Sequence, residues 1–184
     1  VAMQAVGEGS KREALRLVQG LGLNNLIVEA KGADADTLKE QRQRSLGLSL
    51  SDARAALEVT PGAERFAAEK QIKTHSVHSD HGSSDAQASG VTPDYFALAS
   101  LQVAQGRGLG REDDARVAAV AVLGHQAARS LFPQGDAVGR SVKVNHVWLE
   151  VVGVLADRDL SADSFEGVQL GNESNRVFLP LSSA

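Results

Sequence analysis

Seven consecutive apolar residues, Val117 to Leu123, constrain the fold of this chain more than any other feature. Arg116 precedes the run, Gly124 follows it, and no polar residue interrupts it. A strand with one face in water alternates apolar and polar residues, whereas a strand buried on both faces does not. The run therefore predicts a strand at the centre of a sheet.

The residues around this run predict short helices and a hairpin. Thr92, held extended by the following Pro93, can cap a helix, and His125 to Phe132 has the pattern of a short helix that the next proline ends. Valines alternate with polar residues on both sides of Asn145-His146. Because asparagine tolerates a positive φ, this pair predicts the tight turn of a β-hairpin.

The remaining segments predict an α+β chain. We expect helices at Ala5 to Leu21 and Leu50 to Val59. The second helix would be capped by Ser49 or Ser51 and would face inward with Ala53, Ala56 and Leu57. Strands are expected at Asn24 to Ala30 and Val177 to Leu181, and a long hairpin with arms Ala63 to Val77 and Ala86 to Val91. Loops are expected at Lys31 to Arg44 and Asp157 to Asn175.

Composition excludes several classes of function. The 184 residues contain no cysteine, which excludes thiol catalysis and cysteine-ligated zinc. A net charge of −4 provides no general basic field, so a nucleic-acid partner is not expected. No apolar run approaches the roughly 20 residues that span a bilayer, and the first residues do not resemble a signal peptide.

His75, His78, His81 and Asp80 form the group closest in type to a metal site. On a strand, residues three apart point to opposite faces, so His78 cannot share a side with the other two histidines. We therefore predict a solvated hairpin tip and no metal-binding residue.

Two further groups could be mistaken for sites. Gly106, Gly108 and Gly110 lead into four charged residues, three of them acidic, and no strand-to-helix context of a phosphate loop is present, so a turn is predicted. The pairs Asp113 with Asp114 and Asp157 with Asp159 lack the ligand spacing of a calcium loop. We predict that these carboxylates are solvated loop charges.

No catalytic or cofactor-binding residue is predicted either. The serines lack a GxSxG elbow, and His125 and His146 fall at a helix start and a hairpin turn with no reason to meet one serine. Trp148 should face away from Leu149 and Val151, and so pack a second layer or mark a contact surface. Four further aromatic residues are expected in the core: Tyr95, Phe96, Phe132 and Phe178.

Six pieces of sequence, in this order, closely resemble the extracytoplasmic core domain of MacB-type ABC transporter permeases. They are GVTPDYF, QGRGLGREDD, VAVLG, LFPQGDAVGRSVKV, VVGVLAD and VFLPLSS, and the amino-terminal GEGSKREALRLVQGLGLNNLIVEA resembles the segment that follows the first membrane helix of that family. The resemblance spans about the whole chain, which is expected to be a segment excised from a membrane protein.

The resemblance implies three regions. Residues 1–22 would be a helical stalk that continues a membrane helix, residues 23–95 with 172–184 a porter-like β-α-β-β lobe, and residues 96–171 an inserted Sabre-like α+β lobe. The sheets are expected to be mixed or antiparallel.

The resemblance also implies a function. The domain would be periplasmic and non-catalytic, anchored in the bacterial inner membrane, and would couple ATP-driven motion to export of a substrate or to a MacA-like adaptor. Implied partners are an ABC ATPase, reached through the membrane part, and a second permease copy. The alternative is a free-standing periplasmic module that binds a ligand or a protein.

Overall fold

The computed structural model describes residue 28, residues 48–157, residues 164–165 and 168–169, and residues 173–184. Contacts between Cα atoms divide the chain into two compact units, residues 1–66 with 98–100 and residues 67–97 with 101–184. The predicted helix at 5–21 and loop at 31–44 lie outside the described residues. So does the predicted strand at 24–30, except for Val28, which is exposed and belongs to no strand.

The first unit contains helix α3 (Leu50–Val59), with the bounds predicted from the sequence. Ser49, one of the two predicted caps, accepts a hydrogen bond from the Asp52 backbone N–H at 3.2 Å, and the Asp52 carboxylate accepts from the Ser49 backbone N–H at 2.9 Å. This reciprocal capping box satisfies two backbone donors that the helix leaves open. None of the α3 residues is buried, but Ala53 and Leu57 of the predicted inward face are half-buried, whereas Ala56 is exposed.

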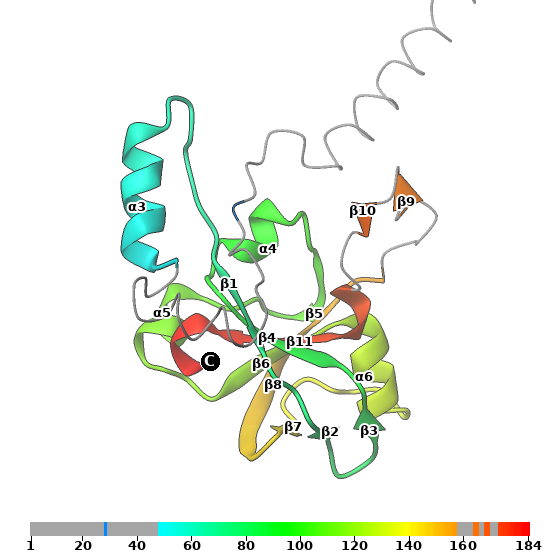
Figure 1. Ribbon diagram of the computed structural model, residues 1–184. Helices are drawn as coiled ribbons and strands as arrows, with labels where there is room; N and C mark the ends of the chain where they lie inside the picture. The colour runs from blue at the N-terminus through cyan, green and yellow to red at the C-terminus, as the bar shows by residue number, and fades with distance from the viewer. Residues whose placement is uncertain (1–27, 29–47, 158–163, 166–167, 170–172) are drawn as a thin grey trace, which may run out of the picture. The chain divides into compact units, whose positions relative to one another are not determined.

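The second unit is built on one mixed sheet of nine strands, in the order β1-β4-β11-β6-β8-β7-β2-β3, with β5 paired to β8 (Figure 1). The pairs β4–β11 and β6–β8 are parallel and the other pairs are antiparallel. The predicted α+β class with mixed pairing is confirmed. The strands are β1 (Glu69–Ile72), β2 (Val77–His78), β3 (Ser83–Ser84), β4 (Gln87–Val91), β5 (Val103–Gly106), β6 (Val120–Leu123), β7 (Ser141–Val144), β8 (Val147–Leu155) and β11 (Arg176–Pro180).

Short helices and turns connect these strands. They are α4 (Tyr95–Leu98), α5 (Arg111–Ala115), α6 (His125–Leu131) and the 3-10 turns η2 (Glu173–Asn175) and η3 (Leu181–Ser183). The stretch from residue 157 to 175, predicted as a loop, contains η2 and the antiparallel pair β9 (Ser164–Phe165) and β10 (Val168–Gln169).

Strand β6 is central in the sheet, as its apolar run predicts, but it begins three residues late. Val117 has a φ of 52° and is 58% exposed. The backbone N–H groups of residues 116, 117 and 118 donate to carbonyls of α5, so these residues close the end of that helix. The prediction of a buried strand from Val117 to Ala119 is therefore wrong.

The two faces of the sheet bury separate apolar clusters. On one face α6 contributes Ala127 and Leu131, which pack with strand residues such as Val142 and Val151. On the other face Val122 and Phe178 pack with Phe96 of α4 and with Leu109 from the loop after β5. Central strands covered on both sides explain the uninterrupted apolar pattern of β6.

The predicted hairpin at Asn145-His146 is confirmed, and the long hairpin is confirmed in part, because its first strand begins at Glu69 and not at Ala63. In the first, Asn145 adopts a φ of 53° in the two-residue turn between β7 and β8. Its side chain also accepts a hydrogen bond from the His75 N–H at 2.8 Å and donates one to the Lys73 carbonyl at 3.1 Å. In the second, β1 pairs with β4 and β2 pairs with β3, so the long hairpin has an interruption in its first arm. There the Thr74 hydroxyl accepts from the Ala88 N–H at 2.8 Å.

Candidate functional site

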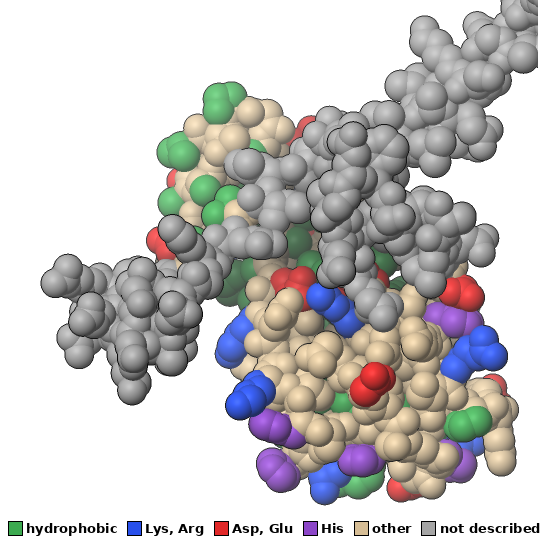
Figure 2. Space-filling model, turned by 45° about the vertical axis from the view of Figure 1, so that its right-hand side comes forward, with side chains coloured by type: hydrophobic (Ala, Val, Ile, Leu, Met, Phe, Trp, Pro, Cys, Tyr) green, Lys and Arg blue, Asp and Glu red, His purple; other side chains and the backbone are tan. Residues whose placement is uncertain are grey.

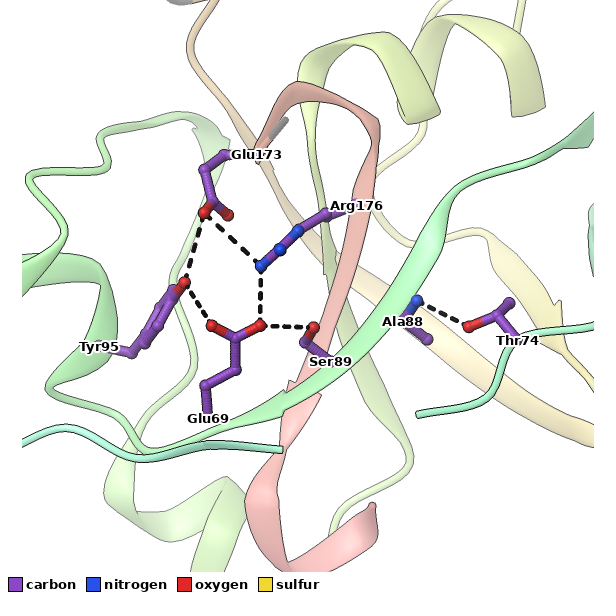
Figure 3. A network of polar contacts seen from close by, with 7 residues as sticks. All are labelled: Glu69, Thr74, Ala88, Ser89, Tyr95, Glu173 and Arg176. Atoms are coloured by element: carbon purple, nitrogen blue, oxygen red, sulfur yellow. Dashed lines mark hydrogen bonds and ion pairs between the residues drawn. The ribbon is translucent and has the colours of Figure 1, made fainter. Parts of the chain in front are cut away.

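A polar network joins five elements of the second unit on one side of the sheet. Figure 3 shows Arg176, at the start of β11, lying between two carboxylates, with a tyrosine hydroxyl closing the ring of contacts. The members are Glu69 of β1, Ser89 of β4, Tyr95 of α4, Glu173 of η2 and Arg176.

Glu69 is the hub of this network. Its Oε1 accepts from Arg176 NH1 at 2.7 Å and from the Ser89 hydroxyl at 2.9 Å, and its Oε2 accepts from the Tyr95 hydroxyl at 3.0 Å. Arg176 NH1 lies 3.6 Å from Glu173 Oε1, which also accepts from Tyr95 at 3.4 Å. Hydrogen bonds with an ionised partner are among the stronger ones in proteins.

The three charged side chains of the network are largely withdrawn from water. Exposed fractions are 15% for Arg176, 24% for Glu69 and 19% for Glu173. Removing a charged side chain from water costs free energy, and only an interaction with an opposite charge or a hydrogen-bond partner offsets that cost. A charge at this depth is therefore tolerated only when it is paired. The network therefore couples β1, η2 and β11 through their charges.

Tyr95 acts in this network as a hydrogen-bond donor. Burial raises the pKa of the Tyr95 phenol, and the negative charges of Glu173 and Glu69 raise this pKa further. The hydroxyl therefore keeps its proton across the physiological pH range. A phenol in this state is a poor base and a poor nucleophile, so the arrangement favours a structural role over acid–base chemistry.

Sequence reasoning missed this network. Tyr95 was expected among core aromatics, and it does pack on Phe178 with ring centroids 5.9 Å apart, but its hydroxyl carries the polar contacts. The other members lie far apart along the chain, Glu69 and Arg176 being separated by 107 residues. The periodicities of helices and strands relate only residues that are close in the sequence, so they do not predict a contact at that separation.

A second ion pair fixes the glycine-containing loop that follows β5. Arg107 donates to both oxygens of Asp113, at 2.6 and 2.9 Å, and the Gly110 N–H donates to the same carboxylate at 2.7 Å. The Arg107 guanidinium, through these hydrogen bonds, lowers the pKa of the Asp113 carboxyl. The loop joins strand β5 to helix α5, so the expectation that it lacks a strand-to-helix context is wrong. Asp113 is buried, so the prediction of a solvated charge at this residue is wrong as well.

The other predicted loop carboxylates are placed separately. Asp114 accepts from the Ser182 N–H at 2.9 Å, which fixes the turn η3 against α5. Asp157 lies 3.6 Å from His125, the first residue of α6, and Asp159 lies outside the described residues. His146 occupies the β7–β8 turn, as predicted.

The structure gives the three neighbouring histidines different surroundings. His78 lies in β2 opposite Ser83 and Lys143, whereas the His81 ring lies against Phe132 with centroids 6.2 Å apart. His75 contacts the β7–β8 turn through its backbone. Within the described part of the chain, no three histidine, aspartate or glutamate side chains are placed to share a metal ion.

We predict that zinc titrated into this protein shows no specific site. Because His78 and His81 lie in different surroundings, no site tighter than about micromolar is expected by calorimetry. The outcome that would contradict this is stoichiometric binding at that affinity which His75→Ala or His81→Ala abolishes.

The aromatic residues other than Tyr95 lie where the sequence places them. Phe96, Phe132 and Phe178 are buried. Trp148 is 50% exposed and belongs to the opposite face of β8 from the buried Leu149. The Lys143 ammonium lies 5.7 Å from the centroid of the indole ring.

Comparisons with known proteins agree on one family. The family described as MacB-like periplasmic core domain matches residues 1–184. A macrolide export ATP-binding/permease protein, MacB 1/2 of Paracoccus denitrificans, is 34% identical over 84% of this chain and 22% of its own length. The pyoverdine export ATP-binding/permease protein PvdT of Pseudomonas aeruginosa is 26% identical over 100% of this chain and 26% of its own length.

A solved structure shares the fold. The periplasmic region of MacB from Actinobacillus actinomycetemcomitans superposes with a TM-score of 0.62 at 22% identity, over 84% of this chain and 63% of that one. The chain spans about a quarter of the curated relatives named above. Among the described residues, no helix has both the length and the apolar character needed to cross a membrane.

Proposed function

Because this chain belongs to the MacB-like periplasmic core domain family, we propose that it is the non-catalytic periplasmic part of an ABC transporter permease. The match over residues 1–184 carries this proposal. Its role is to transmit ATP-driven motion from the membrane to the transport of a substrate out of the cell.

The sheet is suited to transmitting force. Strand β11 lies between β4 and β6, so segments from both ends of the second unit enter the same sheet. The ion pair between Arg176 and Glu69 adds a side-chain connection across β4. Hydrogen-bonded central strands move together, since a one-residue slip would turn every buried side chain to the other face.

The parent protein, in this proposal, is anchored in the bacterial inner membrane and works as a dimer of permeases. It is powered by an ATPase domain or subunit and contacts a periplasmic adaptor. Residues 1–22 are the stalk that leads out of the membrane, and the lobes divide at residues 95 and 172.

The stalk offers a direct test in the full-length parent. Replacing Leu15-Arg16 with Gly-Pro should break the predicted helix, since proline in a helix interior costs about 3 kcal/mol or more. We expect ATP hydrolysis in reconstituted protein to persist while export falls several-fold. Both activities are measured on the same preparation, beside export in cells.

The matched control is Leu15-Arg16→Ala-Ala, which keeps helix propensity and should leave export near the parental level. Circular dichroism of the chain carrying each change establishes that the domain still folds. Undiminished export in the Gly-Pro variant would refute the proposed coupling through this helix.

A further inference from the structure

One row of side chains crosses four strands on a single face of the sheet. The cross-strand partners are Ser83 with His78, His78 with Lys143, and Lys143 with Trp148. Directly paired residues on neighbouring strands project to the same face. The row therefore runs from the sheet edge at β3 to the longest strand, β8.

This face is open at β2, β7 and β8. Trp148 is 50% exposed and the side chains of Ser83 and His78 are exposed as well. On the opposite face of the same strands, Val77, Val142 and Leu149 are buried in the cluster that includes α6. Helix α6 thus covers one face of these strands, and the Trp148 indole is exposed to solvent on the opposite face.

The exposed row has a basic character within an acidic chain. The Lys143 ammonium lies beside the indole, and the exposed His78 imidazole is its neighbour in the row. The chain as a whole has a net charge of −4. The carboxylate of Glu150 belongs to the same face, in the neighbouring row opposite Ser141. In the lower part of Figure 2, histidine, lysine and arginine side chains lie at the surface, with aspartate and glutamate side chains among them.

From this geometry we infer that the His78–Lys143–Trp148 row is a docking surface for an acidic amphipathic helix of a partner protein. Four strands span about 14 Å, which accommodates a helix of about 10–12 Å diameter. A helix is the element that most commonly covers an open sheet face. Its apolar stripe would pack on Trp148 and its carboxylates would pair with Lys143 and His78.

The inference can be tested directly because Trp148 is the only tryptophan in the chain. The probe is a synthetic helical peptide, blocked at both ends, with leucine at spacings of three and four and glutamate elsewhere. A second peptide carries lysine in place of every glutamate. We expect the glutamate peptide to shift Trp148 emission to shorter wavelength and to bind with a Kd on the order of 100 µM or tighter.

Charge reversal separates this surface from general electrostatics. Lys143→Glu should weaken binding of the glutamate peptide about tenfold. Trp148→Ala should abolish binding, and because this variant lacks the fluorophore its binding is measured by calorimetry. The control Arg129→Glu makes the same charge change at an exposed residue of α6, the helix that packs on the opposite face of the sheet from Trp148. It should alter the Kd less than about twofold. Circular dichroism confirms that each variant folds.

Three results would overturn the inference. They are no shift in emission up to about 1 mM glutamate peptide, equal affinity for the lysine peptide, and equal effects of Lys143→Glu and Arg129→Glu. Sedimentation of the parent chain provides a further check. A dimer that Trp148→Ala converts to monomer would assign this face to a second copy instead. None of these measurements depends on transport, so they stand or fall separately from the proposed function.

Discussion

Phe178→Ala is expected to lower the free energy of unfolding by about 3–5 kcal/mol, a large fraction of the stability of a typical domain. Phe178 is fully buried at the centre of the sheet, in β11. Its ring lies edge-on to Phe96 with centroids 5.5 Å apart and packs on Tyr95 as well. Because β11 is hydrogen-bonded to β4 on one side and to β6 on the other, its backbone is held in place and the cavity left by the ring cannot collapse fully.

Urea unfolding followed by circular dichroism measures this loss. The control is Val147→Ala, also in a strand of the sheet but 57% exposed, which should change the free energy of unfolding by no more than about 0.5 kcal/mol. Equal effects of the two substitutions would show that the aromatic cluster is not the core of this unit.

The second large effect is expected for Arg176→Met, at about 3–5 kcal/mol. Methionine keeps most of the side-chain volume but removes the guanidinium that Glu69 and Glu173 share, so it no longer offsets the repulsion between these two carboxylates. The measurement is again urea unfolding, at neutral pH.

Two further variants test the reason for this loss. Arg129→Met removes an exposed arginine from α6 and should change stability by no more than about 0.5 kcal/mol. Adding Glu69→Gln to Arg176→Met should restore part of the stability, because one unpaired charge is removed. A double variant no more stable than Arg176→Met would show that lost packing, not unpaired charge, causes the effect.

The parts of this fold that sequence predicts are those whose causes are local. Asn145 permits the positive φ of a two-residue turn, and Ser49 with Asp52 completes a capping box within four residues. The apolar run places β6 at the centre of the sheet, but hydrophobicity alone cannot locate its first residue. Val117 and Ala118 are apolar, yet their backbone N–H groups close α5.

The parts that sequence does not predict depend on contacts between distant segments. Glu69 has no local sign of its pairing with Arg176, which lies 107 residues away. Asp113 is an exception, because the arginine that pairs with it, Arg107, precedes it by only six residues. The resemblance to a family implied the class of fold, but not which side chains meet. Tyr95 illustrates both cases, since its ring follows the apolar pattern and its hydroxyl follows the tertiary structure.

The position of β11 between β4 and β6 also dictates an order of events during synthesis. Residues 176–180 leave the ribosome after every other strand of the sheet, yet they occupy its interior. Until they insert, β4 and β6 each present an unpaired apolar edge, which is the feature that promotes association between chains. The pairing of β11 with β4 and β6 at the middle of the sheet therefore forms last, and a nascent chain stalled before residue 176 would be prone to aggregation.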